Sequence, residues 1–227
     1  MSSQRLTRRR MVTAGLGLAA LSTIPSRMTP LSAAAALVPT PRQTEGPFYP
    51  ESLPLDHDND LLQVEGQERQ AAGTPLHLFG RVLTESARPL AGLRVEIWQC
   101  DAFGHYHHPR DRGSADPAFQ GYGQTVTAAD GAYRFRTIRP VAYPGRTPHI
   151  HFAISGSGIE RLVTQMYVAG EPQNERDWIL GRIRDQAARE SVIVALAPAP
   201  ELGPAAPESG SLTGTFDIVL GRTLLDG

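Results

Sequence analysis

Short segments of β type, separated by turn residues, fill the chain from Leu76 onward and constrain its fold more than any other feature. Between Leu93 and Cys100, apolar and polar residues alternate, which is the period of a strand with one buried face. The pair Asp130-Gly131, between two such segments, is typical of a hairpin turn. The chain also contains 22 glycines and 19 prolines, which favours turns over a helical bundle. The predicted strands are 76–84, 93–100, 125–127, 132–138, 149–154, 162–168, 191–197 and 213–220.

A single segment, 174–189, has the spacing of an amphipathic helix. In a helix, Trp178, Ile179, Ile183 and Ala187 would lie on one side, away from the acids and arginines. Many short strands with turn signals between them, together with one short helix, predict an all-β fold of the β-sandwich type.

The strands are preceded by a segment of different composition. Residues 37–75 are rich in proline and polar residues and show no sustained periodicity. We therefore expect an irregular N-terminal arm over 37–75, followed by one β-sandwich domain over 76–222.

The first 36 residues have the parts of an export signal. A basic stretch that includes Arg8 and Arg9 is followed by an apolar stretch over 11–24 and by small residues at 32–36. The paired arginines favour a twin-arginine signal over an ordinary secretory signal or a basic tail. The sequence therefore predicts a signal peptide over 1–36 and an exported protein, periplasmic or extracellular.

Charge and cysteine content exclude several classes of protein. All basic residues are arginine, and the formal net charge is −1, which argues against a nucleic-acid partner. No apolar run reaches the ~18 residues that a membrane-spanning helix needs. The single cysteine, Cys100, cannot form an internal disulfide or a cysteine cluster for a metal.

The segment His149-Ile-His151 is the first candidate for chemistry. Side chains two apart on a strand point to the same face, so both imidazoles can reach one metal ion. The alternative to a metal site is that the two histidines are ordinary polar strand residues or part of a hydrogen-bonded cluster. A cupin site is excluded by spacing, because the next acid is Glu160 and no histidine follows.

Two tyrosines are candidates for the remaining ligands. Tyr106 and Tyr143 lie in loop-like segments before the histidine pair, and phenolate oxygens with imidazoles suit Fe(III) better than zinc. Each tyrosine taken alone is more typical of a packed ring whose hydroxyl is hydrogen-bonded, so the assignment depends on the surrounding motifs.

Several further motifs surround these residues in a fixed order. They are Thr40–Phe48, Val95–Asp101 followed by Gly104-His-Tyr106, Asp130–Ile138, Arg139-Pro with Tyr143-Pro and Arg146, His149–Phe152, Leu162–Tyr167 and Phe216–Leu220. This ordered set closely resembles the intradiol ring-cleavage dioxygenases, nearest to the iron-bearing β subunit of the protocatechuate 3,4-dioxygenase branch. The resemblance covers residues 40–221.

The resemblance implies one ferric ion per chain, a catechol-type substrate and O2. The metal ligands that it implies are Tyr106, Tyr143, His149 and His151. The catalytic residues that it implies are Tyr143, Arg146 and Gln165. The substrate-binding residues that it implies are Thr44, Gly46, Pro47 and Phe48. It also implies that a bound catechol displaces Tyr143, which then accepts a proton, and that cleavage gives a diacid of the cis,cis-muconate type. We interpret His105, His107 and His108 as groups around the site rather than as ligands.

The chain departs from the family pattern in two places. The loop between Tyr143 and His149 is shorter than in the protocatechuate enzymes, and the helical N-terminal region of the catechol-cleaving branch is missing. The shorter loop leaves open an iron site that acts on a different ligand. The α-like arm and β-like ligands on one chain are compatible with a homo-oligomer.

A second resemblance belongs to a different class of protein. Residues 80–135 also resemble the transthyretin-like or carboxypeptidase-regulatory β-sandwich, a non-catalytic binding module. That pattern explains neither the two tyrosines nor the histidine pair, and such a module would contain no iron.

Overall fold

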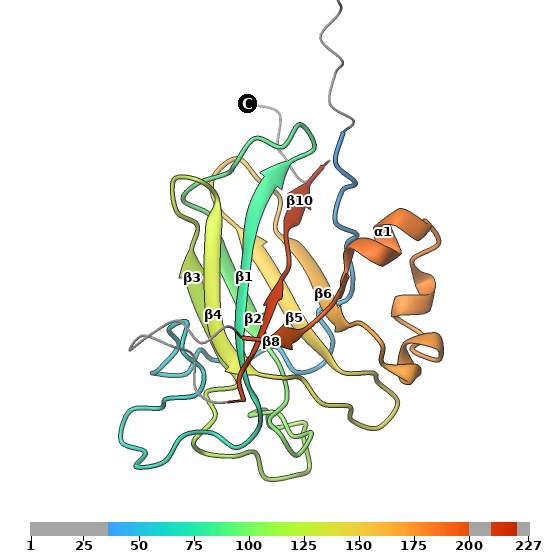
Figure 1. Cartoon of the computed structure of the whole chain (residues 1–227). Coiled ribbons are helices and arrows are strands. Elements are labelled where there is room, and N and C mark those ends of the chain that lie inside the picture. Colours follow the sequence, from blue (N-terminus) through green and yellow to red (C-terminus); the bar gives the residue numbers. More distant parts are fainter. Residues whose placement is uncertain (1–35, 200–209, 222–227) are drawn as a thin grey trace, which may run out of the picture. The chain divides into compact units, whose positions relative to one another are not determined.

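The computed structural model describes residues 36–199 and 210–221 (Figure 1). The predicted signal over 1–36 lies outside the described residues except for Ala36, and residue 222 also lies outside them. Within the described part, two five-stranded sheets account for the strands, which confirms the all-β prediction. No helix in that part is long and apolar enough to cross a membrane.

The first sheet is built around β1 (Pro75–Thr84). The strand β4 (Ala132–Ile138) pairs with it in antiparallel fashion. Two short strands, β9 (Leu212–Thr215) and β10 (Ile218–Leu220), pair in parallel with successive halves of β1. The strand β8 (Ala197–Pro198) extends the sheet beyond β9.

The second sheet carries the residues of interest. Its strand order is β3 (Tyr122–Val126), β2 (Arg94–Trp98), β5 (His149–Ser155), β6 (Leu162–Val168) and β7 (Ile193–Val194). Neighbours are antiparallel except for the parallel pair β6 and β7. The strand β5 is central, and only its last residue is more than marginally exposed.

The two faces of β5 have different partners because side chains alternate along a strand. Ile150 and Phe152 join the main core, together with Leu78 and Phe135 of the first sheet. His149 and His151 therefore point to the other face of the sheet. The core fixes the register of β5, because a slip of one residue would bury imidazoles between the sheets.

The N-terminal arm covers that other face. Residues 36–74 form no helix or strand, which agrees with the predicted irregular arm. The backbone N–H of Gln43 donates to the Val163 carbonyl at 2.8 Å, and the Thr164 hydroxyl donates to the Pro41 carbonyl at 2.8 Å. The arm thereby buries the outer face of β5 and β6.

The predicted helix over 174–189 is wrong. The segment forms two 3-10 turns, η1 (Pro172–Glu175) and η2 (Leu180–Arg182), and one short helix, α1 (Gln186–Ser191). The Asp177 carboxylate accepts the backbone N–H groups of Ile179 and Leu180, so a separate turn begins there instead of one continuous helix. An aspartate again, Asp185, caps the start of α1.

Trp178 and two of the predicted strands also differ between the sequence prediction and the structure. Trp178 does not join an apolar helix face but is 54% exposed, with Arg182 over its ring. The predicted strand 191–197 is reduced to β7 and β8, and the predicted strand 213–220 is divided into β9 and β10.

Close packing of the first sheet requires glycine at position 80. A Cβ there would collide with the Phe216 carbonyl oxygen and the Tyr133 hydroxyl, which are hydrogen-bonded to each other. We expect Gly80→Ala to lower the free energy of unfolding by about 3 kcal/mol, because neither backbone nor buried ring can withdraw. Denaturant unfolding measures this, with Gly181→Ala as control, since a Cβ there meets nothing within 4 Å. Equal stability of the two variants would contradict the packing.

Candidate metal centre

The centre begins with two histidines under the arm. His149 and His151 are each 1% exposed, and their Nε2 atoms lie 3.2 Å apart. Register places Trp98 on β2 and Gln165 on β6 opposite His151. The Trp98 ring stacks on the His151 imidazole at 4.8 Å and 11°, which fixes the plane of that imidazole.

Both imidazoles are neutral. Burial lowers the pKa of His149 to about 3 and the pKa of His151 well below its usual value, since the charged form loses its hydration. His149 Nδ1 lies 2.6 Å from the Thr147 carbonyl oxygen, which can only accept. We therefore assign the His149 proton to Nδ1, which leaves its Nε2 lone pair free for a metal ion.

Two tyrosines complete the group of rings. Tyr106 follows β2 and Tyr143 follows β4, and their rings are 5.6 Å apart and nearly perpendicular. Tyr143 lies 5.5 Å from His149 and Tyr106 lies 6.5 Å from His151, between ring centroids. The Tyr106 hydroxyl is buried and has no hydrogen-bond partner of normal geometry among the described residues. The structure thus brings together all four predicted ligands.

These four side chains fit ferric iron. Donor atoms ~2.1 Å from one ion are roughly 3.0–3.4 Å apart at bond angles near 90–110°, and the two Nε2 atoms have that spacing. Burial raises the pKa of the Tyr106 phenol well above its usual value, so a phenolate at this place needs a cation beside it. Among the described residues, no three histidine, cysteine or carboxylate groups converge on another site. Hard phenolate oxygens with imidazoles suit Fe(III).

Local turn chemistry places Tyr143 beside Arg146. The turn Tyr143-Pro144-Gly145-Arg146 is closed by a 2.9 Å bond from the Arg146 N–H to the Tyr143 carbonyl. Proline at the second position and glycine with φ of 83° at the third are typical of a type II turn. Burial raises the pKa of Tyr143, and the positive Arg146 opposes that shift.

Arg146 is held by two buried side chains. Its Nη2 donates to Gln165 Oε1 at 2.6 Å, and its Nε donates to Asp177 Oδ2 at 2.8 Å. Gln165 in turn donates to the Thr44 carbonyl of the arm at 2.9 Å. The predicted residues Arg146, Gln165 and Thr44 therefore form one connected chain of hydrogen bonds.

Asp177 is the residue that sequence reasoning missed. Its side chain is fully buried and accepts the N–H groups of Thr147, Ile179 and Leu180 as well as the Arg146 guanidinium. Burial acts to raise its pKa, but these donors lower it below its usual value, so Asp177 is ionised. It lay in the segment predicted as a helix with its acids on the solvent side, which concealed it.

The arm residues divide into two groups. A Cβ at Gly46, where φ is 74°, would lie 3.3 Å from His151 Cε1, and the Phe48 ring stacks on Tyr106 at 4.5 Å. The side chains of Thr44 and Pro47 are exposed instead. Of these four predicted residues, Gly46 and Phe48 are therefore the two that lie against the rings of the candidate ligands.

The histidines around Tyr106 have partners of their own. His105 faces Asp111 at 3.2 Å, and the Asp111 carboxylate also accepts the Tyr106 backbone N–H at 2.8 Å. His107 Nε2 contacts a backbone carbonyl at 3.0 Å, and His108 lies 3.8 Å from Glu51. These contacts agree with the interpretation that the three histidines surround the site.

Known proteins resemble the chain over nearly the whole described part. The sequence profile of the Dioxygenase family matches residues 44–222. The protocatechuate 3,4-dioxygenase beta chain of Burkholderia cepacia is 40% identical over 177 residues, which is 74% of this chain and 72% of that protein. The chain belongs to the intradiol ring-cleavage dioxygenase family. The family match includes the four candidate ligands, and nothing favours the alternative binding module.

Other members of the intradiol dioxygenase family are longer. Catechol 1,2-dioxygenase 1 of Acinetobacter lwoffii is 32% identical over 151 residues, 59% of this chain but 47% of that protein. The chain spans about half the length of the catechol and hydroxyquinol enzymes that it matches. Among solved structures, the dioxygenase domain of a carbohydrate-binding fusion from Streptomyces sp. SirexAA-E has 32% identity and a TM-score of 0.61, covering 81% of this chain and 99% of that one.

Proposed function

We propose that this chain is a non-haem iron dioxygenase that cleaves a catechol-type ring between its two hydroxylated carbons. The observation that carries the proposal is the convergence of His149, His151, Tyr106 and Tyr143 at one buried place, where the Tyr106 hydroxyl has no hydrogen-bond partner of normal geometry among the described residues. A ferric ion held by these four residues would withdraw electron density from the catechol oxygens and make the ring reactive toward O2.

The reaction consumes one catechol and one O2. The bond between the two hydroxylated carbons breaks, and each of these carbons gains one oxygen atom and becomes a carboxyl carbon. Catechol itself would give cis,cis-muconic acid, with both O2 atoms in the product and no external reductant.

The chain's own residues would bind and orient the substrate. In its phenolate form, Tyr143 would take up a catechol hydroxyl proton, which is general-base chemistry. Arg146 keeps its charge at any relevant pH and can stabilise negative charge on the ring carbon that reacts. Gln165 and Asp177 hold the guanidinium in place, and the arm at Gly46 and Phe48 excludes water from the centre.

Isotope labelling tests the proposal. The full chain, loaded with iron, is incubated with catechol under 18O2, and the acidic product is analysed by mass spectrometry. We expect a diacid that carries two labelled oxygens and a stoichiometry of one O2 per catechol. A ring opened beside the two hydroxyl-bearing carbons, or no O2 uptake by iron-loaded protein, would contradict the proposal.

Replacement of Asp177 tests its role as a positioning residue. Asp177→Asn keeps the size of the side chain but removes the charge that faces Arg146. We expect kcat to fall about tenfold to a hundredfold while iron content stays unchanged, which is the usual range for a residue that orients another. Steady-state kinetics and metal analysis measure the two quantities.

Asp185→Asn is the matched control, because Asp185 caps α1 but does not contact Arg146. Its kcat should equal that of the natural protein. A fall in kcat of the same size in both variants would assign the effect to the helical segment and not to the Arg146 contact.

We also propose that the protein is exported. The support is the basic and apolar pattern of residues 1–36, which includes Arg8 and Arg9. Fractionation of cells that express the natural chain and an Arg8→Lys/Arg9→Lys variant tests this, since the variant should stay inside the cell. Equal export of both would contradict a twin-arginine signal.

A further inference from the structure

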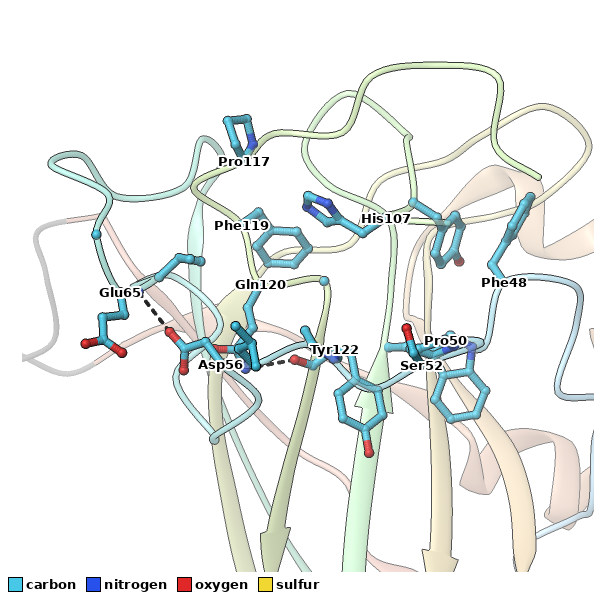
Figure 2. Close-up of a pocket in the computed structure, with 17 residues that line it drawn as sticks. Phe48, Pro50, Ser52, Asp56, Glu65, His107, Pro117, Phe119, Gln120 and Tyr122 are labelled. Atoms are coloured by element: carbon cyan, nitrogen blue, oxygen red, sulfur yellow. Dashed lines mark hydrogen bonds between the residues drawn. The ribbon is translucent and has the colours of Figure 1, made fainter. Parts of the chain in front are cut away.

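A cavity of about 640 Å³ lies beside the candidate centre. Figure 2 shows Phe48 at one end and Asp56 with Glu65 at the other, and His107 and Phe119 along one side. Most of its lining residues are apolar or aromatic. This volume is in the range of pockets that bind drug-sized molecules and exceeds what a single dihydroxybenzene ring requires.

The cavity and the centre share walls. Tyr106 and Trp98 line the cavity, and the same rings are a candidate ligand and the stacking partner of His151. Phe48, the third shared residue, stacks on Tyr106 and lies edge-on to Tyr143 at 6.2 Å between centroids. The cavity therefore lies next to the centre, with the rings of Phe48, Trp98 and Tyr106 at the boundary between them.

The charges around the cavity select among possible ligands. Its lining contains no arginine, and the far end carries Asp56 and Glu65. The Asp56 carboxylate accepts the Glu65 backbone N–H at 2.9 Å, which holds that end together. A carboxylate in this cavity would lie near two acids and would have no arginine to pair with, which is unfavourable in a partly enclosed site.

The lining of the cavity is largely apolar and aromatic, and its charged side chains are the two acids at the far end. These features favour a substituent that is mostly apolar and carries no negative charge.

We infer that the cavity receives a large neutral substituent of the substrate, so that the preferred substrates are catechols with an apolar group and not carboxylated catechols. The inference rests on the proposed function and adds its substrate class. The dihydroxylated ring would lie at the centre, and the substituent would extend past Phe48 into the cavity.

Kinetics with 4-phenylcatechol, catechol and protocatechuate test the inference on the iron-loaded full chain. We expect kcat/KM for 4-phenylcatechol to exceed that for protocatechuate by at least about tenfold, since apolar groups that fit a pocket give differences of this order. Ser52→Trp would fill the mouth of the cavity, where Ser52 is an exposed lining residue. It should lower kcat/KM for 4-phenylcatechol about tenfold and leave that for catechol unchanged.

Two matched controls accompany these measurements. Ser157→Trp introduces the same ring on an exposed turn outside the cavity and should change neither substrate. Glu65→Arg should raise kcat/KM for protocatechuate about tenfold, whereas Glu68→Arg, outside the lining, should not. Equal effects of each variant and its control would overturn the inference.

A binding measurement separates this inference from the proposed function. The probes are 4-phenylphenol and phenol, titrated calorimetrically into the full chain. Each has a single hydroxyl group and therefore lacks the bond between two hydroxylated carbons that the reaction breaks. We expect 4-phenylphenol to bind at least about tenfold more tightly than phenol, and Ser52→Trp to abolish the difference. Equal binding of the two phenols by a protein that cleaves catechol would overturn the cavity inference alone. Tighter binding of 4-phenylphenol without cleavage of any catechol would contradict the proposed function, and the substrate class with it.

Discussion

The His149→Ala protein should be colourless, should hold less than about 0.1 iron per chain and should lose turnover by at least a factor of about 1,000. The reason is geometric. His149 has its Nδ1 proton committed to the Thr147 carbonyl, so its Nε2 lone pair points at the same place as that of His151. Loss of one of four ligands leaves three, and among the described residues no group of three histidine, cysteine or carboxylate side chains lies together to hold the metal instead.

Metal analysis and O2 uptake measure this prediction. His77→Ala is the control, because His77 lies on β1 in the other sheet and is only partly buried. It should keep iron and activity. A His149→Ala protein that turns over catechol without iron would refute the ligand assignment.

Arg146→Ala is expected to show the opposite combination, with iron and colour retained and kcat lowered by a factor of about 100 to 1,000. Arg146 is not one of the four candidate ligands but lies beside Tyr143 in the same turn. Its charged side chain is only 7% exposed. A fixed positive charge in such a place stabilises developing negative charge far better than it would in water.

Removal of Arg146 also leaves Asp177 buried without its cation, which costs about 3–5 kcal/mol of stability. Arg146→Lys is therefore measured as well, because lysine keeps the charge but cannot donate in two fixed directions to Gln165 and Asp177. We expect an intermediate kcat for it. The surface variant Arg81→Ala should behave as the natural protein. Full activity of folded, iron-loaded Arg146→Ala would contradict the assigned role.

The strands were predictable from sequence because their pattern is local. The alternation around β2 and the spacing of the histidines in β5 require no knowledge of distant residues. The histidine pair, both tyrosines and Arg146 were also found before the structure, because the ordered motifs identify the family even where each residue alone is ambiguous.

The rest depends on contacts between distant parts of the chain. The 174–189 segment has helical spacing, but Asp177 competes for the backbone N–H groups and turns its carboxylate inward to Arg146, 31 residues away. The arm residue Gly46 lies against His151, and the arm is held there by hydrogen bonds to β6, which is more than a hundred residues away in the sequence. The cavity beside Tyr106 likewise forms between the arm and the connection from β2 to β3, so no pattern within one short segment predicts it.

The central claim is that four side chains of this chain hold one ferric ion to which a catechol can bind. The most direct test is the iron content and visible spectrum of the purified protein, before and after anaerobic addition of catechol. We predict one ferric ion per chain, an absorption band from tyrosinate bound to iron, and a shift of that band when catechol is added. A colourless protein that cannot be loaded with iron would contradict the account.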